Sequence, residues 1–257
     1  MDLIGWQFTP YILPVLGAAV LLAALAAYAW QQREDAPGTW VFVALTGLSS
    51  WWCFTYALEL MSTDPETMLL WVQLEWISIA LLPVTWLLFA LIYTGRARYV
   101  RVSTILLLAA LPLGIIALAW TTPAHTLLYA NPGVTVNGRF VAFDAERGPA
   151  FYVHVIYSYA LVLTAVALLY RLWRRSIGQQ RALVRMVLIG ALLPLIGNAI
   201  YQLALLIDRP IYVDLTVLAF AVSGLLFTWG WFRLRLSDLV PELVELAPGT
   251  PDTDAAD

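Results

Sequence analysis

Seven apolar runs of about 20 residues, separated by short polar segments, are the feature that most constrains this chain. Each run has the length that an α-helix needs to cross the hydrocarbon core of a bilayer. Barrel strands would instead alternate polar and apolar residues, and no such alternation persists here. Since 61% of the 257 residues are hydrophobic and only 12% are charged, water cannot be the main solvent. The sequence therefore predicts an all-α integral membrane protein, a bundle of seven transmembrane helices.

Proline and acidic residues mark where several of these helices begin. Asp64-Pro65-Glu66 offers an N-cap, a proline at the first helical position and an acidic first turn. Gly148-Pro149 and Arg209-Pro210 open the fifth and seventh helices in the same way. The predicted helices span residues 10–30, 38–61, 66–93, 101–120, 150–172, 182–206 and 211–235.

Arginine placement predicts how the bundle is oriented. The chain has no lysine, and eleven of its 14 basic residues fall in alternate connections on one side, in 31–38, 94–101, 171–185 and 233–235. Only Arg139, Arg147 and Arg209 fall on the other side. Because basic residues are enriched in cytoplasmic loops, we expect the N-terminus outside, the C-terminus in the cytoplasm and the protein in the cell membrane as a multi-pass chain.

The longest predicted outer connection, residues 121–149, carries a hairpin signal. Asn137-Gly138 stands between β-forming residues from Val134 to Phe143. Asn-Gly is favoured where both central residues of a tight turn need positive φ. We expect an extracellular β-hairpin between the fourth and fifth helices, which either covers a site as a lid or serves as a rigid spacer.

Polar residues are costly inside a bilayer, and here they concentrate in the halves of the helices that face outside. The inner halves hold little beyond scattered serines, threonines and Tyr56. This distribution predicts an outward-facing polar cavity. Its candidate ligand-binding residues are Glu59, Glu75, His154, Tyr157, Asn198, Tyr201 and Asp214.

Each of these residues also has a purely structural interpretation. Glu59 and Asp214 could be solvated at headgroup level, and Asp214 could complement a helix N-terminus. Asn198, one turn after Pro194, could replace the backbone hydrogen bond that proline removes. Glu75 and His154 are ionisable and lie farther from the helix ends, so they could form a buried carboxylate–histidine pair.

The sequence contains none of the local signatures of catalysis. There is no Walker loop, HExxH, Gly-x-Ser-x-Gly or dinucleotide-binding glycine motif. The single cysteine, Cys53, excludes an intrachain disulfide, and the absence of lysine excludes a retinal Schiff base. We therefore expect no enzyme activity, no catalytic residue, no metal or other cofactor and no nucleic-acid partner.

A set of residues in a consistent order extends from the second helix to beyond the seventh. Its members are Trp52, Tyr56-Ala57-Leu58-Glu59, Trp71, Pro83, Trp86, Phe89, Tyr93-Thr94-Gly95-Arg96, His125, His154, Tyr157, Tyr159, Leu193-Pro194, Gly197-Asn198, Tyr201, Asp214-Leu215-Thr216, Ser223-Gly224 and Asp238-Leu239-Val240-Pro241. Together they resemble the N-terminal seven-helix region of prokaryotic histidine kinases. Pro123 stands where that family usually has asparagine.

The resemblance implies a seven-transmembrane sensor domain, here residues 1–240, that passes a conformational signal to a cytoplasmic module. The implied partners are the lipid bilayer, an unidentified small-molecule ligand and a cytoplasmic histidine kinase or other signalling protein. Residues 241–257 are rich in proline and acidic residues, so we expect a short disordered cytoplasmic tail and a sensor whose output lies in another module. Apolar residues at helical spacing in 236–246 could pair with a second copy as a homodimer.

Two other functions remain open at this point. A small-solute or proton transporter would need polar groups along the whole path through the bilayer. A scaffold would recruit cytoplasmic partners through the arginines of 171–185 without binding a ligand.

Overall fold

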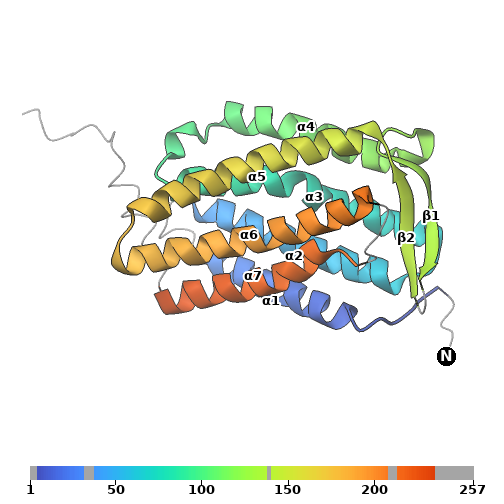
Figure 1. The fold of residues 1–257 in the computed structure, drawn as a ribbon, viewed down its shortest axis with the longest axis horizontal. Helices are drawn as coiled ribbons and strands as arrows, with labels where there is room; N and C mark the ends of the chain where they lie inside the picture. The colour runs from blue at the N-terminus through green and yellow to red at the C-terminus, as the bar shows by residue number, and fades with distance from the viewer. Residues whose placement is uncertain (1–4, 32–37, 138–139, 208–212, 235–257) are drawn as a thin grey trace, which may run out of the picture.

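The computed structural model describes residues 5–31, 38–137, 140–207 and 213–234 (Figure 1). Seven α-helices run up and down through it. Two antiparallel strands, β1 (Tyr129–Asn137) and β2 (Phe140–Arg147), lie between the fourth and fifth helices, and short 3-10 turns flank the fourth. The helices are α1 (Ile12–Gln31), α2 (Thr39–Met61), α3 (Pro65–Tyr93), α4 (Val102–Trp120), α5 (Pro149–Arg175), α6 (Gly178–Leu206) and α7 (Leu215–Leu234).

The helix starts follow the capping chemistry of the sequence. Asp64 caps α3, accepting hydrogen bonds from the backbone N and Oγ1 of Thr67 at 2.9 and 2.8 Å, and these bonds lower the pKa of its exposed carboxyl. Pro149 occupies the first position of α5, after Gly148. The expected start of α7 was wrong, because Val213 and Asp214 precede the helix. Residues 209–210, 236–246 and the expected tail at 241–257 lie outside the described residues.

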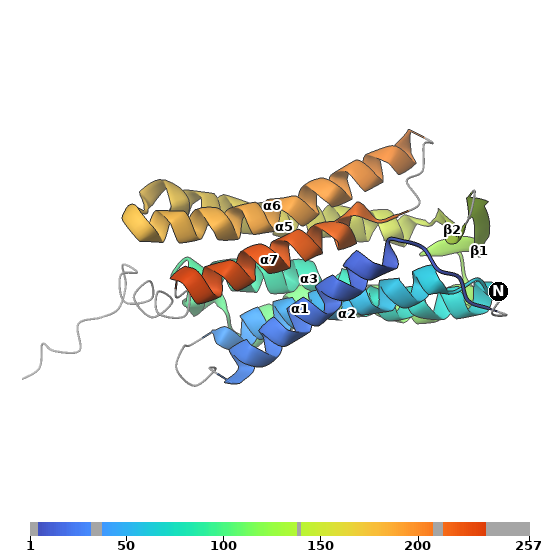
Figure 2. The same ribbon diagram turned by 90° about the horizontal axis from the view of Figure 1, so that it is seen from below.

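Helix α3 is the centre of the bundle, buried on nearly all sides. It packs against α2, α4 and α5, while α1 packs against α2 and α7, and α6 packs between α5 and α7 (Figures 1 and 2). Helix α4 lies at the edge, with only Pro112, Ile115 and Ala119 buried. This arrangement gives α7 contacts on both sides, with α6 and with α1.

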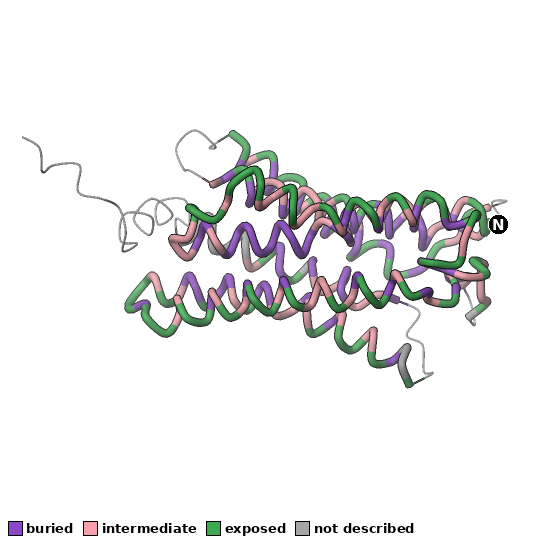
Figure 3. Tube along the Cα trace, turned by 90° about the horizontal axis from the view of Figure 1, so that it is seen from above, coloured by how far each residue is buried: buried purple, intermediate pink, exposed green. Residues whose placement is uncertain are grey.

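The outer surface of the bundle is apolar. Buried residues follow the inner sides of the helices (Figure 3). Large aliphatic side chains such as Leu107 and Ile156 are exposed. Six helices, α1 to α6, are long and apolar enough to cross a membrane, and α7 adds the apolar stretch Leu215–Leu226. Trp30, Trp40 and Trp120 are exposed near helix ends, as expected of interfacial anchors. The chain is a multi-pass membrane protein.

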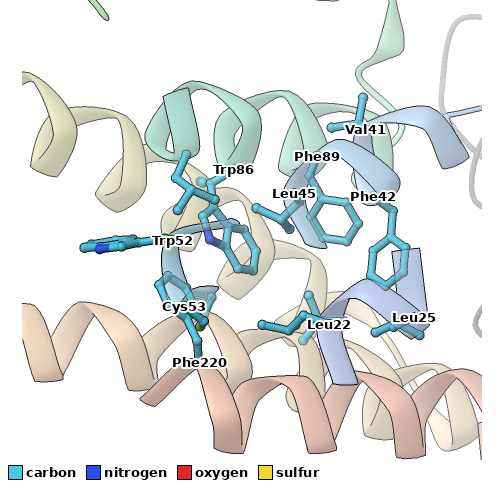
Figure 4. Close-up of a cluster of buried hydrophobic side chains, with 14 of the residues drawn as sticks. Leu22, Leu25, Val41, Phe42, Leu45, Trp52, Cys53, Trp86, Phe89 and Phe220 are labelled. Atoms are coloured by element: carbon cyan, nitrogen blue, oxygen red, sulfur yellow. The ribbon is translucent and has the colours of Figure 1, made fainter. Parts of the chain in front are cut away.

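The half of the bundle away from the hairpin is filled by apolar side chains. Figure 4 shows the cluster that Leu22, Leu45, Phe42 and Phe89 form with neighbours from α1 to α3. Trp52 of α2 packs edge-on against Phe220 of α7, at a centroid distance of 5.5 Å.

The hairpin covers the end of the bundle where α3 and α5 begin (Figure 1). Asn137 is the last residue of β1 and pairs with Phe140, so the expectation that Asn137 lies in the turn was wrong. Residues 138–139 lie outside the described residues. Gln7 binds the second strand from the N-terminal segment, exchanging two 2.7 Å hydrogen bonds with the backbone N and O of Val141.

Candidate functional site

A cavity of about 290 Å³ lies inside the bundle at the end covered by the hairpin. Residues from α2, α3, α5, α6 and α7 form its walls, and residues from β1 and β2 line it as well. The cavity therefore brings together segments far apart in the sequence, which no local motif could reveal.

Six of the seven candidate ligand-binding residues line this one cavity: Glu59, Glu75, His154, Asn198, Tyr201 and Asp214. Tyr157 does not. Its hydroxyl donates a 2.7 Å hydrogen bond to the carbonyl oxygen of Leu108, so it joins α5 to α4. The reason is helical spacing, since residues 154 and 158 share one face of α5 while residue 157 is turned toward α4.

Three of the carboxyl groups that line the cavity come from separate segments of the bundle. Glu59 of α2 and Glu75 of α3 are buried, and their carboxyls adjoin within hydrogen-bonding reach. Asp214, just before α7, is near enough to act electrostatically on both. Glu75 Oε1 is buried and has no hydrogen-bond partner among the described residues. The site is thus acidic at its centre.

His154 does not pair with Glu75 as a hydrogen-bonded carboxylate–histidine unit. Its Nε2 lies 3.1 Å from the Oγ of Ser158 on the same helix. Its ring packs edge-on against the indole of Trp76, at a centroid distance of 5.2 Å. The imidazole is therefore held in place by its own helix and by an aromatic neighbour.

Aromatic side chains close the cavity on the side of the hairpin. The indole N–H of Trp76 donates a 3.2 Å hydrogen bond to the hydroxyl of Tyr129, and both rings pack against Phe151. Burial raises the pKa of Tyr129 to about 12, so this phenol stays protonated in the physiological range. Trp76 directly follows Glu75 in the sequence, but this adjacency did not predict that Trp76 lines the cavity.

A chain of hydrogen bonds joins four helices along one wall. The hydroxyl of Tyr159 (α5) donates to Asn198 Oδ1 (α6) at 2.9 Å, and Asn198 Nδ2 donates to Thr216 Oγ1 (α7) at 3.2 Å. The backbone N of Thr216 donates to Asp214 Oδ1 at 2.7 Å, and the backbone N of Asp214 donates to the hydroxyl of Tyr56 (α2) at 2.7 Å. Both ends of the Asn198 amide thus bind other helices rather than the backbone beside Pro194.

The same hydrogen bonds settle two structural interpretations. Asp214 does cap α7, as a residue complementing a helix N-terminus would, and it also lines the cavity. Tyr56 had been assigned to the dry inner half, and that assignment was wrong, since it lines the cavity and contacts the start of α7. No residue-spacing rule relates positions 56 and 214, so only the tertiary structure could show this.

Gly197 lets α7 approach α6 beside this wall. A Cβ at position 197 would lie 2.9 Å from the carbonyl oxygen of Leu215 and 3.2 Å from the backbone N of Thr216. The absent side chain therefore sets the separation at which Asn198 reaches Thr216. This explains in physical terms why glycine precedes asparagine here.

The donor set does not suit a metal ion. Within the described residues, no three histidine, cysteine, aspartate or glutamate side chains are grouped closely enough to hold one. His125 lies away from the cavity, with Nε2 2.9 Å from Thr121 Oγ1 and Nδ1 accepting a hydrogen bond from the backbone N of Leu127. The arrangement suits noncovalent binding of a small organic molecule.

The opposite end of the bundle carries the described arginines of the 94–101 and 171–185 segments. Arg147, on β2, is the described arginine on the hairpin side. The charge asymmetry expected from the sequence thus corresponds to the two ends of one bundle.

Comparison with known proteins identifies the family. A family model described as the N-terminal 7TM region of histidine kinase matches residues 14–241, which is most of the chain. A search of curated proteins found no match to the chain. The family match spans α2 to α7, all of α1 except its first two residues, and every residue that lines the cavity. The chain belongs to the family of seven-transmembrane sensor regions that form the N-terminal part of histidine kinases.

Proposed function

We propose that the cavity is the sensory site of this input domain, which detects a small molecule or a membrane condition and passes a conformational signal to a cytoplasmic module. The observation that carries the proposal is that one cavity inside the bundle, lined by ionisable and aromatic residues, contacts the start of α7, the last of the described helices. The signalling partner on the cytoplasmic side would be a histidine kinase module, fused or separate.

The orientation is part of this proposal. The hairpin, the N-terminal segment and the cavity face outside, and the arginine-rich connections face the cytoplasm. The concentration of arginines at the end away from the hairpin supports this, because basic residues are retained on the cytoplasmic side. A ligand would then reach the cavity from outside, past the hairpin, whose Thr135 and Phe143 line it.

The proposed signal is a change in how α7 packs. A ligand shifts a conformational equilibrium only by its differential affinity for the two states. Here the groups that would touch it are joined to the start of α7 through Asn198–Thr216 and Tyr56–Asp214. Replacing or distorting either contact would move α7, the last of the described helices, relative to α2 and α6.

The transporter alternative is less well supported. A transport path needs polar groups or water along the whole membrane depth. The described residues beyond the cavity form a packed apolar cluster, with Leu22, Leu45, Leu88 and Val187 at most 4% exposed. A polar site that ends against such a cluster favours a receptor.

The test joins the chain, after residue 241, to a histidine kinase catalytic module and measures autophosphorylation in membrane vesicles. Glu75→Leu with His154→Phe should change the basal rate several-fold, because both side chains line the cavity. Glu66→Leu, at an exposed position on the first turn of α3, is the control. Unchanged phosphorylation in the double variant, with normal membrane insertion, would refute the proposal.

A further inference from the structure

The charges that line the cavity are unbalanced. Four acidic residues line it, Glu59, Glu75, Asp144 and Asp214, against the single arginine Arg147 among the described residues. The Nη1 of Arg147 donates to the carbonyl oxygen of Ala145, and the guanidinium lies 5.9 Å from the Phe151 ring centroid, while its buried Nε has no hydrogen-bond partner among the described residues. The lining therefore has an excess of carboxyl groups over cationic groups.

Glu75 is the centre of this excess. It is 5% exposed, its Oε1 has no hydrogen-bond partner among the described residues, and Glu59 adjoins it. It lies ten residues into α3, about 15 Å from the start of that helix. A buried carboxylate is strongly unfavourable unless a cation or hydrogen-bond donors compensate it. A cationic N–H group of a ligand would supply the donor that Glu75 Oε1 lacks among the described residues.

Three indole rings line the same cavity as these carboxyls. Trp52, Trp76 and Trp86 all line the cavity, and Trp76 is the residue next to Glu75. Tryptophan faces attract ammonium groups more strongly than other aromatic rings do, and the attraction increases when water is excluded. The same rings would bind the apolar part of a ligand by ordinary burial. Carboxyls among indoles form a site selective for organic cations over neutral or anionic molecules.

From these observations we infer that the cavity binds a small organic cation, a protonated amine or quaternary ammonium, held by Glu75 and Glu59 among the three tryptophans. The volume of about 290 Å³ is at the lower end of the range for ligand pockets, roughly 300–1,000 Å³, so the ligand is small. This inference rests on the proposed function in that it assigns a ligand class to the same cavity. Its test measures binding, which does not depend on signal output.

The experiment is isothermal titration calorimetry of the full chain in uncharged dodecyl maltoside micelles, with benzylammonium and tetramethylammonium as probes. Benzyl alcohol and benzoate are the controls, because they are similar to benzylammonium in size and shape but are neutral and anionic, respectively. We expect saturable binding of the cations and at least about tenfold weaker binding of both controls. Comparable binding of benzyl alcohol or benzoate, or no saturable binding of either cation, would overturn the inference.

Isosteric variants locate the site. Glu75→Gln should weaken benzylammonium binding by about tenfold or more, and Glu59→Gln should weaken it in the same direction. Glu66→Gln makes the same change at an exposed position of α3 and should leave binding unaltered. Circular dichroism and gel filtration report folding, and if Glu75→Gln fails to fold, Glu59→Gln carries the test alone. Binding unaffected by the folded cavity variants would overturn the assignment.

The cation could be free in solution or the headgroup of an amine-bearing lipid, and lipid addition distinguishes them. Competition by phosphatidylethanolamine, but not by phosphatidylglycerol, would identify a headgroup, and no competition would identify a free amine. Both outcomes support the cationic class. In the kinase fusion, cation binding without any change in phosphorylation would refute the proposed function alone. A cavity-dependent response to a non-cationic molecule, with no cation binding, would refute the ligand class alone.

Discussion

The hydroxyl of Tyr56 accepts a 2.7 Å hydrogen bond from the backbone amide of Asp214, which joins α2 to the start of α7 across the cavity wall. Tyr56 is 5% exposed and Asp214 is half-buried, so the bond is partly shielded from water. Asn198 holds the first turn of α7 from α6. The last helix is therefore positioned by two polar contacts on different helices, both at the edge of the candidate ligand site.

Tyr56→Phe removes the first of these contacts without changing the shape of the side chain. The amide of Asp214 would lose its acceptor, and because this bond is part-buried the expected cost is about 0.5–1.5 kcal/mol. We expect a lower thermal unfolding midpoint in micelles and an altered basal phosphorylation rate in the kinase fusion. Tyr170→Phe, at a position 45% exposed on α5, should change neither quantity. Equal effects of the two variants would contradict the role given to Tyr56.

Tyr159→Phe tests the contact between Asn198 and Thr216 by removing the hydroxyl on α5 that binds Asn198. Asn198 Oδ1 would lose the donor on α5, while its bond to Thr216 could remain. Because the tyrosine is half-buried, the expected loss is likewise about 0.5–1.5 kcal/mol of unfolding free energy. The matched control is Tyr152→Phe, 55% exposed on the same helix. If both variants unfold at the same temperature as the parent chain, the Tyr159–Asn198 bond contributes nothing to stability.

The helices could be predicted closely from the sequence because their signals are local. The start of α3 depends on Asp64-Pro65 and that of α5 on Gly148-Pro149, and both lie within one residue of the expected position. The start of α7 was predicted less well, since Asp214 supplies a cap that the apolar pattern conceals. Local chemistry determines where a helix begins, and it can be recognised without knowing the neighbours.

The site was only partly predictable, for the opposite reason. Ionisable residues such as Glu75 could be picked out from the sequence, because placing an ionisable side chain inside a bilayer is unfavourable whatever its neighbours are. It could not identify Trp76 or Tyr56, which resemble ordinary core or anchor residues until α5 and α7 are placed beside them. Polarity alone also does not say toward which neighbour a helix face points, and the hydroxyl of Tyr157 binds α4 rather than facing the cavity.

Gly197→Ala should separate α6 from α7. The added methyl group would lie 2.9 Å from the carbonyl oxygen of Leu215, closer than packed atoms allow, and backbone cannot rotate away as a side chain can. Overpacking of this kind costs about 1–3 kcal/mol. Gly47→Ala, in α2, is the matched control because a Cβ at that position would meet no atom within 4 Å, and it should be neutral or stabilising by up to about 1 kcal/mol.

Differential scanning fluorimetry would compare the two glycine variants directly. We also expect Gly197→Ala to weaken benzylammonium binding, because Asn198 and Asp214 line the cavity beside the displaced helix start. A Gly197→Ala protein as stable as Gly47→Ala would show that the α6–α7 approach is not tight.

Gln7→Ala should loosen the hairpin over the cavity. Gln7 Nε2 donates to the carbonyl oxygens of Leu60, Ser62 and Val141, and its Oε1 accepts from the Val141 amide. Losing the bond at Val141, worth about 1 kcal/mol, should speed hydrogen exchange of that amide about fivefold. Gln179→Ala, at an exposed position on α6, is the control, and mass spectrometry of the peptide covering β2 is the measurement. Unchanged exchange would show that the hairpin is held without Gln7.

The proposed orientation can be measured by cysteine labelling in intact cells, and the native cysteine does not have to be replaced first. Cys53 is the sole cysteine of the chain and is fully buried, so a membrane-impermeant maleimide should leave the parent protein unlabelled. Glu146→Cys places a thiol at an exposed position on β2, and Gln179→Cys places one at an exposed position near the start of α6. Both sites avoid the cavity lining.

If the hairpin faces outside, Glu146→Cys should be labelled in intact cells and Gln179→Cys only after the membrane is permeabilised. This follows from the arginines that surround Gln179, Arg175 and Arg181 among them, which should hold that connection in the cytoplasm. The reverse pattern would place the cavity mouth on the cytoplasmic side. In that case the ligand would come from inside the cell, the family membership would stand, and the proposed direction of signalling would be wrong.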